Sequence, residues 1–422
     1  MKTSSLRLLL AWSLCALPVA TALGANVACS RAASADELAT LADAPLSPPR
    51  AELLELAFDA ASAFPTNPHA KNRSRAQETV IQACLELERF RTASLWSERV
   101  DDWRRGTCYA ELAYRLAERG STAAAEASLA LARTVAERAE KAVSDEDTEQ
   151  TWRRDRVLAG IARTELLLGR HGKAEELAAG LTDSEAGRVE IARAAGFDEE
   201  QFEAHLKSVD ETVAVGNFDL MKAALESCVR LFDRFYGDAE RRERVEAKIK
   251  SSWNKLPIDV RVDLMFALTE SALDHQDHVR ALALVEESKQ IVDGARWLPE
   301  DRIPVLARLA SLRFRAGDVA TARSDASFAL AFYDAEHTKI VDVYRAGALR
   351  PLAETYQTFG DRDEARKVYA LALEAGATNP NSRPRAQDLV ATCCSMAVSG
   401  FEPDPELRAR ARALRDALGE PW

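Results

Sequence analysis

Proline and glycine are scarce in this sequence, at 15 and 18 of 422 residues. Alanine, leucine, glutamate and arginine dominate instead, and a mixture of this kind favours helix over strand. Hydrophobic residues make up 47% of the chain and charged residues 29%, which is the composition of a soluble globular protein. We therefore expect an all-α fold.

Positive charge is in deficit. The chain has 56 lysines and arginines against 67 aspartates and glutamates, which gives a net charge of −11. A surface of this sign repels the phosphate backbone of nucleic acids unless a basic face is segregated. We therefore expect no nucleic-acid partner.

Cysteine is too sparse and too irregularly spaced to form a disulfide framework. The chain has seven cysteines and no C-x-x-C motif, whereas small secreted disulfide domains are shorter and denser in cysteine. A pairing of Cys84 with Cys108 across neighbouring repeats stays open in an oxidising compartment. The adjacent Cys393 and Cys394 are explained by two small residues on a packed helix.

Catalytic signatures are also missing. The sequence contains no phosphate-binding glycine loop, no H-E-x-x-H and no G-x-S-x-G. Ser252 and Lys255 match S-x-x-K, but the partner motifs are absent. His275 and His278 flank Asp277 in a group that could bind a metal, although a turn explains its polarity equally well. The sequence predicts no catalytic residues, no cofactor and no metal site.

The only long apolar run lies at the N-terminus. Lys2 and Arg7 precede the run Leu8–Val19, and the small residues 20–25 follow it. This is the pattern of a secretory signal peptide, and the run is too short for a membrane-spanning helix of about 20 residues. We expect a signal peptide over residues 1–25 and an exported protein, with an uncleaved anchor as the alternative.

Cys29 offers a second way to process the N-terminus. It follows Val27 and Ala28, which resembles the end of a bacterial lipobox, but Asn26 stands where that pattern has an aliphatic residue. Lipidation would move the cleavage site to residue 28. Residues 26–50 are rich in alanine, proline and aspartate and are predicted to form a flexible linker.

The remainder of the chain repeats one pattern. DDWRRGTCYAELAYRLAERG (101–120) and QTWRRDRVLAGIARTELLLG (150–169) share Trp-Arg-Arg, an aliphatic-Ala pair and a glycine at the same offsets. In LAETYQTFGDRDEARKVYALALEAG (352–376) the apolar residues follow helical spacing, a Gly-Asp pair marks a turn, and Ala365 falls where two helices would cross. This segment resembles a tetratricopeptide repeat. The resemblance implies a right-handed α-solenoid of stacked antiparallel helical hairpins that follows the signal peptide.

Further copies of the pattern are anchored at Leu112, Ile161, Leu268 and Leu309, and a degenerate copy lies near Val80. The pattern weakens over residues 181–256, where we expect divergent helical hairpins. Pro257 is a good helix start, so we predict N-terminal repeats over 51–256 and C-terminal repeats over 257–422. The arginine-rich segment 407–416 is predicted to belong to a polar capping hairpin that faces solvent.

An arginine stands seven residues before the anchor in each of six copies, at the start of the first helix. We predict an Arg–Asp ladder that links successive repeats along one edge, and an anion-binding row is the alternative. The six residues are Arg73, Arg105, Arg154, Arg261, Arg302 and Arg345.

The function expected from the resemblance is that of an interaction scaffold without catalytic activity. Helical repeats form a concave groove lined by the first helix of each unit, and such a groove binds a protein or peptide by shape and charge. An enzyme, or a regulatory subunit of an envelope enzyme, is the alternative. Membrane contact is expected only through a lipid anchor or an uncleaved signal. The predicted groove residues are Tyr114, Arg163, Glu270, Ser311 and Glu354.

Overall fold

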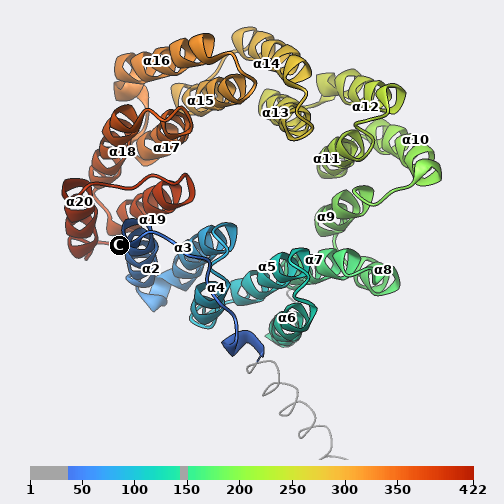
Figure 1. Cartoon of the computed structure of the whole chain (residues 1–422). Coiled ribbons are helices and arrows are strands. Elements are labelled where there is room, and N and C mark those ends of the chain that lie inside the picture. The colour runs from blue at the N-terminus through green and yellow to red at the C-terminus, as the bar shows by residue number, and fades with distance from the viewer. Residues whose placement is uncertain (1–36, 143–150) are drawn as a thin grey trace, which may run out of the picture.

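The computed structural model describes residues 37–142 and 151–422 (Figure 1). In these two ranges the chain forms nineteen α-helices, two short 3-10 helices and no strand, which confirms the all-α prediction for this part of the chain. An isolated bridge between Asp43 and Arg89 is the one β-type pairing there. The predicted signal peptide and Cys29 lie outside the described residues.

The helices form an inner layer and an outer layer around a central opening (Figure 1). The inner helices are α3 (Thr66–Glu86), α5 (Arg104–Glu118), α7 (Thr151–Leu167), α9 (Asp183–Ala194), α11 (Phe218–Arg234), α13 (Ile258–Asp274), α15 (Pro299–Arg315), α17 (Asp342–Thr358) and α19 (Ser382–Val398). The others are α2 (Pro48–Ser62), α4 (Phe90–Ser97), α6 (Thr122–Ala142), α8 (His171–Ala178), α10 (Glu199–Val215), α12 (Ala239–Ser252), α14 (His278–Asp293), α16 (Val319–Glu336), α18 (Arg362–Ala377) and α20 (Pro405–Asp416).

The layers form a closed ring. Each inner helix packs on the next one, from α3 through α19. The last inner helix, α19, then packs on α2 and α3, so that the two ends of the described chain meet (Figure 1). We call the central opening the lumen.

Close approach between inner helices gives the ring its curvature. A Cβ atom added to Gly160 of α7 would lie 2.9 Å from the Cβ of Ala110 in α5, and one added to Gly187 of α9 would lie 2.8 Å from that of Ala223 in α11. Most neighbouring outer helices, by contrast, make few or no contacts with one another. Tight packing inside and open spacing outside bend the stack towards the inner side.

Aspartates start most of the outer helices. The side chains of Asp198, Asp238, Asp277, Asp318 and Asp404 accept hydrogen bonds from backbone N–H groups in the first turns of α10, α12, α14, α16 and α20. A side chain of this type satisfies one of the backbone donors that a helix N-terminus leaves without a partner. These aspartates therefore explain locally why these five outer helices begin where they do.

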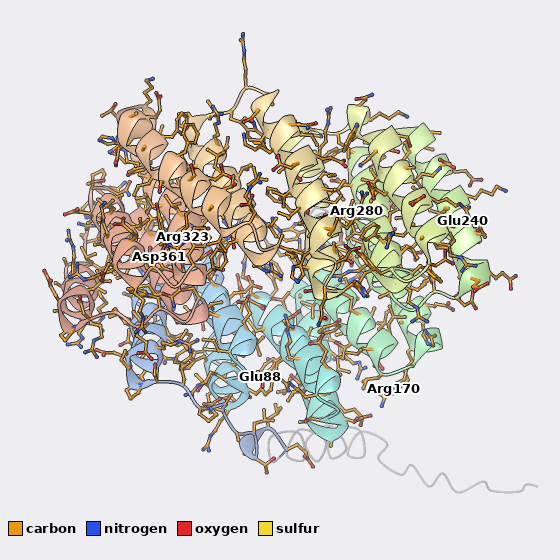
Figure 2. All side chains as sticks on the ribbon, turned by 45° about the horizontal axis from the view of Figure 1, so that its top comes forward. Glu88, Arg170, Glu240, Arg280, Arg323 and Asp361 are labelled. Carbon is orange, nitrogen blue, oxygen red and sulfur yellow. The ribbon has the colours of Figure 1, made fainter. Side chains whose placement is uncertain are left out.

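Ion pairs bridge the gaps between outer helices. Arg280 of α14 pairs with Glu246 of α12, and Arg323 of α16 pairs with Asp361, the residue that precedes α18. Arg323 and Asp361 lie next to each other in Figure 2. Links between successive units thus exist along the outer side, but other arginines than the six predicted ones form them.

The predicted capping hairpin lies at the seam of the ring. Most of α20 is exposed, with Leu407 and Ala411 as its buried residues, and it also sends Arg408 and Arg412 to Glu52 of α2, while Arg415 approaches Asp59 at 3.7 Å. Apolar contact continues beside these pairs, since the rings of Phe64 and Trp422 lie 5.2 Å apart, centroid to centroid. The arginine-rich face is explained by acids on α2, which are far away in sequence.

The linker predicted over residues 26–50 ends earlier than expected. Leu38 is buried, Asp43 accepts hydrogen bonds from the backbone and hydroxyl of Thr92, and α2 already begins at Pro48.

The boundary predicted at Leu256–Pro257 coincides with the turn between α12 and α13, across which α11 packs on α13. Within the described ranges, no helix has the length and hydrophobicity needed to cross a membrane.

Candidate binding surfaces

Each inner helix leaves one stripe of side chains uncovered. Neighbouring inner helices cover two of its sides and an outer helix covers a third, so the remaining side faces the lumen. In α15 this stripe contains Arg308, Ser311 and Arg315, and in α13 it contains Asp263, Glu270 and Asp274. The spacing of three or four residues is that of one helix face. We call these residues the lumenal stripes.

All five predicted groove residues lie on lumenal stripes of inner helices and are half-buried. The structure brings two of them together, because the guanidinium of Arg163 lies 4.9 Å from the ring centroid of Tyr114. Glu270, Ser311 and Glu354 lie further round the ring, on α13, α15 and α17. Whether a partner contacts them stays a prediction.

Charges on neighbouring stripes pair with one another. Arg308 of α15 lies 3.3 Å from Asp263 and 3.0 Å from Glu270, both on α13. Partial desolvation by the neighbouring helices raises the pKa of Asp263, while Arg308 opposes that rise. These side chains are well exposed, so each pair contributes little to stability and can exchange partners at low cost.

Glu354 is held more firmly. Its carboxylate accepts a hydrogen bond from the hydroxyl of Ser395 on α19 at 2.5 Å. Burial nevertheless raises the pKa of Glu354, and the nearby carboxylate of Glu86 adds to the rise. A buried carboxylate of this kind favours a cationic or hydrogen-bonding neighbour at this point of the lumen.

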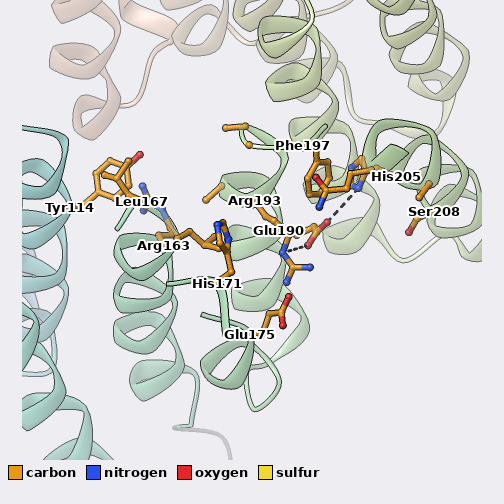
Figure 3. A pocket seen from close by; sticks show the side chains of 16 residues that line it. Tyr114, Arg163, Leu167, His171, Glu175, Glu190, Arg193, Phe197, His205 and Ser208 are labelled. Carbon is orange, nitrogen blue, oxygen red and sulfur yellow. Dashed lines mark ion pairs between the residues drawn. The ribbon is translucent and has the colours of Figure 1, made fainter. Parts of the chain in front are cut away.

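A cavity of about 770 Å³ lies beside α8 (Figure 3). Arg163 and Leu167 of α7 and His171 of α8 line one side, and residues of α9, α10 and the loop between them line the other. Tyr114 lies at its edge, so the cavity is continuous with the lumenal stripe of α5. We call this cavity the α8 notch.

A chain of three polar side chains crosses the far wall of the α8 notch. Nδ1 of His205 lies 3.4 Å from a carboxylate oxygen of Glu190, and Nε2 lies 2.6 Å from Oγ of Ser227. The hydrogen bond with His205 lowers the pKa of Glu190, and Arg193 adds to the effect. Sequence motifs could not reveal this group, because its members come from α9, α10 and α11 at irregular spacing.

The order Glu–His–Ser is that of a nucleophilic triad, but the serine cannot act as a nucleophile here. Ser227 is fully buried, and its hydroxyl donates to the carbonyl of Ala224 at 2.6 Å. The hydroxyl of Ser227 is thus bonded to both His205 and Ala224, and none of it is exposed to a substrate. The group holds α9, α10 and α11 together and positions His205 at the notch.

The repeat-start arginines contact backbone carbonyls as well as acids, and the predicted Arg–Asp ladder stays a prediction. Three of them donate from Nε to the carbonyl five residues earlier. Arg105 donates to Val100 at 2.6 Å, Arg261 to Leu256 at 2.8 Å and Arg345 to Ile340 at 3.0 Å. Arg73 donates to the carbonyls of Ser62 and Phe64. These four arginines fasten the turns before their inner helices. Two of them also approach an acid near a repeat start, since Arg345 lies 2.7 Å from Asp342 and Arg73 lies 3.9 Å from Asp101.

The remaining two arginines are paired with acids close in sequence. Arg154 donates to its neighbour Asp155, which is itself buried, and Arg302 lies 3.8 Å from Asp293 at the end of α14. Each of these pairs links segments that are close in sequence, and the pairs do not form one continuous edge along the ring. The alternative of a free anion-binding row is not supported, since carbonyls and acids already occupy the six guanidinium groups.

The cysteines of the described part of the chain are unpaired and buried. Cys84, Cys108, Cys228, Cys393 and Cys394 are all free, so the Cys84–Cys108 disulfide left open by the sequence does not form. Burial raises the pKa of each thiol, which keeps it protonated and unreactive.

The polar turn around Asp277 has other partners than a metal. His275 stacks on Tyr236 and lies 3.1 Å from Asp233, and Asp277 caps α14. Over residues 37–142 and 151–422, no group of three histidine, cysteine, aspartate or glutamate side chains is arranged to hold a metal ion.

A scan against protein-family models matches no family, and a search of curated proteins returns no match. The resemblance to tetratricopeptide repeats therefore depends on the repeated residues and on the helical hairpins alone.

Proposed function

We propose that this protein is an exported, non-catalytic scaffold of the tetratricopeptide-like solenoid type, which binds a segment of another protein in the lumen of its ring. The observation that carries the proposal is the set of lumenal stripes. They present charged and aromatic side chains towards one shared space, and their mutual ion pairs are weak enough to be exchanged for a partner's charges.

The stripes of α13 and α15 favour a partner that carries charges of both signs. Asp263, Glu270 and Asp274 offer carboxylates, while Arg308 and Arg315 offer guanidinium groups one helix further on. Such a surface selects its partner by electrostatic complementarity more than by apolar burial. An enzymatic role has less support, because the Glu–His–Ser group beside the α8 notch places its serine out of reach of any substrate.

The test is site-specific photo-crosslinking of the full chain in cells of its own source. A photoreactive residue replaces Ser311 on the lumenal stripe of α15 or, as the matched control, Val279 on the outer helix α14, whose side chain is 83% exposed. We expect a discrete protein adduct from position 311 and none from position 279. The charge reversal Glu270→Lys should weaken the adduct at 311, because it removes the acid opposite Arg308.

Two results would contradict the proposal. Equal adducts at both positions would show nonspecific contact, and an adduct at 311 that Glu270→Lys leaves unchanged would show that lumenal charge does not select the partner. Fractionation of the same cells tests export, and recovery of the chain in the soluble cytosol would overturn that part.

A further inference from the structure

The α8 notch results from the shortness of one outer helix. Two outer helices, α4 and α8, have 8 residues each. Beside α4, the buried Leu38 of the same chain partly fills the space between α4 and α6, and a smaller cavity of about 440 Å³ remains. Beside α8, the corresponding space between α8 and α10 stays open as the cavity of about 770 Å³. Cavities of roughly 300–1,000 Å³ suit small organic ligands.

Part of the wall of the notch is apolar. Leu166 and Leu167 at the end of α7 face Phe197 and the alanines of α9 and α10 across the space. Leu167 is 44% exposed although it is a large apolar residue at the inner edge of the ring wall. An occupant with an apolar body would bury this surface, as Leu38 does beside α4.

The charged groups of the notch offer more hydrogen-bond donors than acceptors. The carboxylate of Glu190 is already shared between His205 and Arg193, at 3.4 and 3.5 Å. Arg163 has one acidic neighbour, Glu111, at 3.7 Å, which exceeds a hydrogen-bond distance, and Glu111 also attracts Arg115. Nε of Arg193 is the atom that faces Glu190, and at 3.5 Å it makes an ion pair without a hydrogen bond.

The first turn of α8 adds donors on the same side. Arg170 occupies the N-cap position and its side chain makes no capping hydrogen bond, so the first backbone N–H groups of α8 have no side-chain acceptor. His171 begins this turn and lies between Arg163 and Arg193 in Figure 3. Backbone donors at a helix start favour a negative charge. Glu175, one turn further along α8, lies below this group in the same view.

We propose that the α8 notch binds a small organic carboxylate with an apolar body. Its carboxylate accepts hydrogen bonds from Arg163, Arg193 and the start of α8, and its apolar part packs on Leu166, Leu167 and Phe197. This site lies in the ring wall and does not depend on partner binding in the lumen.

The test is isothermal titration of the full chain with two series of probes. One series contains phenyl-substituted acids from phenylacetate to 6-phenylhexanoate, and the other contains the corresponding neutral amides. We expect at least one acid to bind. Its amide should bind at least about tenfold more weakly, which is the size of effect expected when one hydrogen bond to a charged group is lost.

Two variants locate the site. Arg163→Gln should weaken acid binding by about tenfold and leave the amide unchanged, since it removes one charged donor. Arg230→Gln on α11, an exposed arginine outside the notch, should change neither. The thermal unfolding midpoint of each variant reports whether it folds. Failure of every acid to bind, equal affinity for acid and amide, or equal effects of the two variants would overturn the proposal.

Discussion

Gly160 allows two inner helices to approach more closely than any other residue would permit. An added Cβ would meet the Cβ of Ala110 at 2.9 Å, and neither atom belongs to a flexible side chain that could turn away. We expect Gly160→Ala to reduce the free energy of unfolding by about 1–2 kcal/mol, because overpacking costs roughly 1–3 kcal/mol and better helix propensity returns up to about 1 kcal/mol. Urea unfolding measures the change.

Gly172 provides the control at the same scale. It also lies in a helix, but an added Cβ would have no atom within 4 Å. Gly172→Ala should therefore leave stability unchanged or raise it slightly. Equal losses in the two variants would show that helix contact at Gly160 is not the cause.

At the scale of the element, the outer helices depend on their N-terminal aspartates. Asp277 accepts hydrogen bonds from the backbone N–H of Arg280 and from the hydroxyl of Tyr236, at 3.0 Å each. These bonds, the backbone one first, lower the pKa of Asp277. A carboxyl whose pKa is lower in the folded state stabilises that state above its unfolded pKa of about 3.9, and the contribution is lost as pH falls through the folded value.

Asp277→Asn keeps a capping oxygen but removes the charge. We expect it to be less stable than the unmodified chain at pH 7 by several tenths of a kcal/mol to about 1 kcal/mol, the usual size of a charge effect at a helix N-terminus. The difference should shrink as pH falls below about 4. Urea unfolding at pH 7, 5, 4 and 3 measures it, with the exposed Asp274→Asn as control. A difference that does not vary with pH would contradict the assignment.

For the whole molecule, the seam between α2 and α19–α20 decides whether the ring is closed. Glu52 pairs with two arginines of α20 at the surface, while Trp422 covers the buried Phe64. We expect Trp422→Ala to cost about 1–3 kcal/mol through lost apolar burial. Glu52→Gln should cost less than about 1 kcal/mol, and 1 M salt should abolish that cost.

Urea unfolding at low and high salt separates the two contributions, and small-angle scattering reports any opening of the ring. Val279→Ala, at an exposed position far from the seam, provides the control for a lost side chain. If Glu52→Gln proved the more damaging variant at high salt, the seam would depend on charge rather than on apolar packing.

The sequence by itself determined the local features of this protein. Helical periodicity, the Gly-Asp turns and the aspartates before the outer helices act within a few residues, so the all-α fold is readable from the chain, as are the hairpins of the divergent region, seen as α9 to α12. The lumenal position of the predicted groove residues follows from the same periodicity, because one uncovered face per inner helix recurs at fixed offsets.

Contacts between residues that are far apart in the sequence were decided only by the tertiary structure. Glu52 and Arg408 are 356 positions apart, and their contact depends on the summed bend of every unit between them, which no local pattern records. The carbonyl partners of the repeat-start arginines depend on how tightly each turn folds back, and the acids nearby in the sequence account for only part of their contacts, such as that of Arg345 with Asp342. The α8 notch likewise exists because a short helix leaves a gap between its neighbours, and that gap has size and charge only once α7 to α10 are packed.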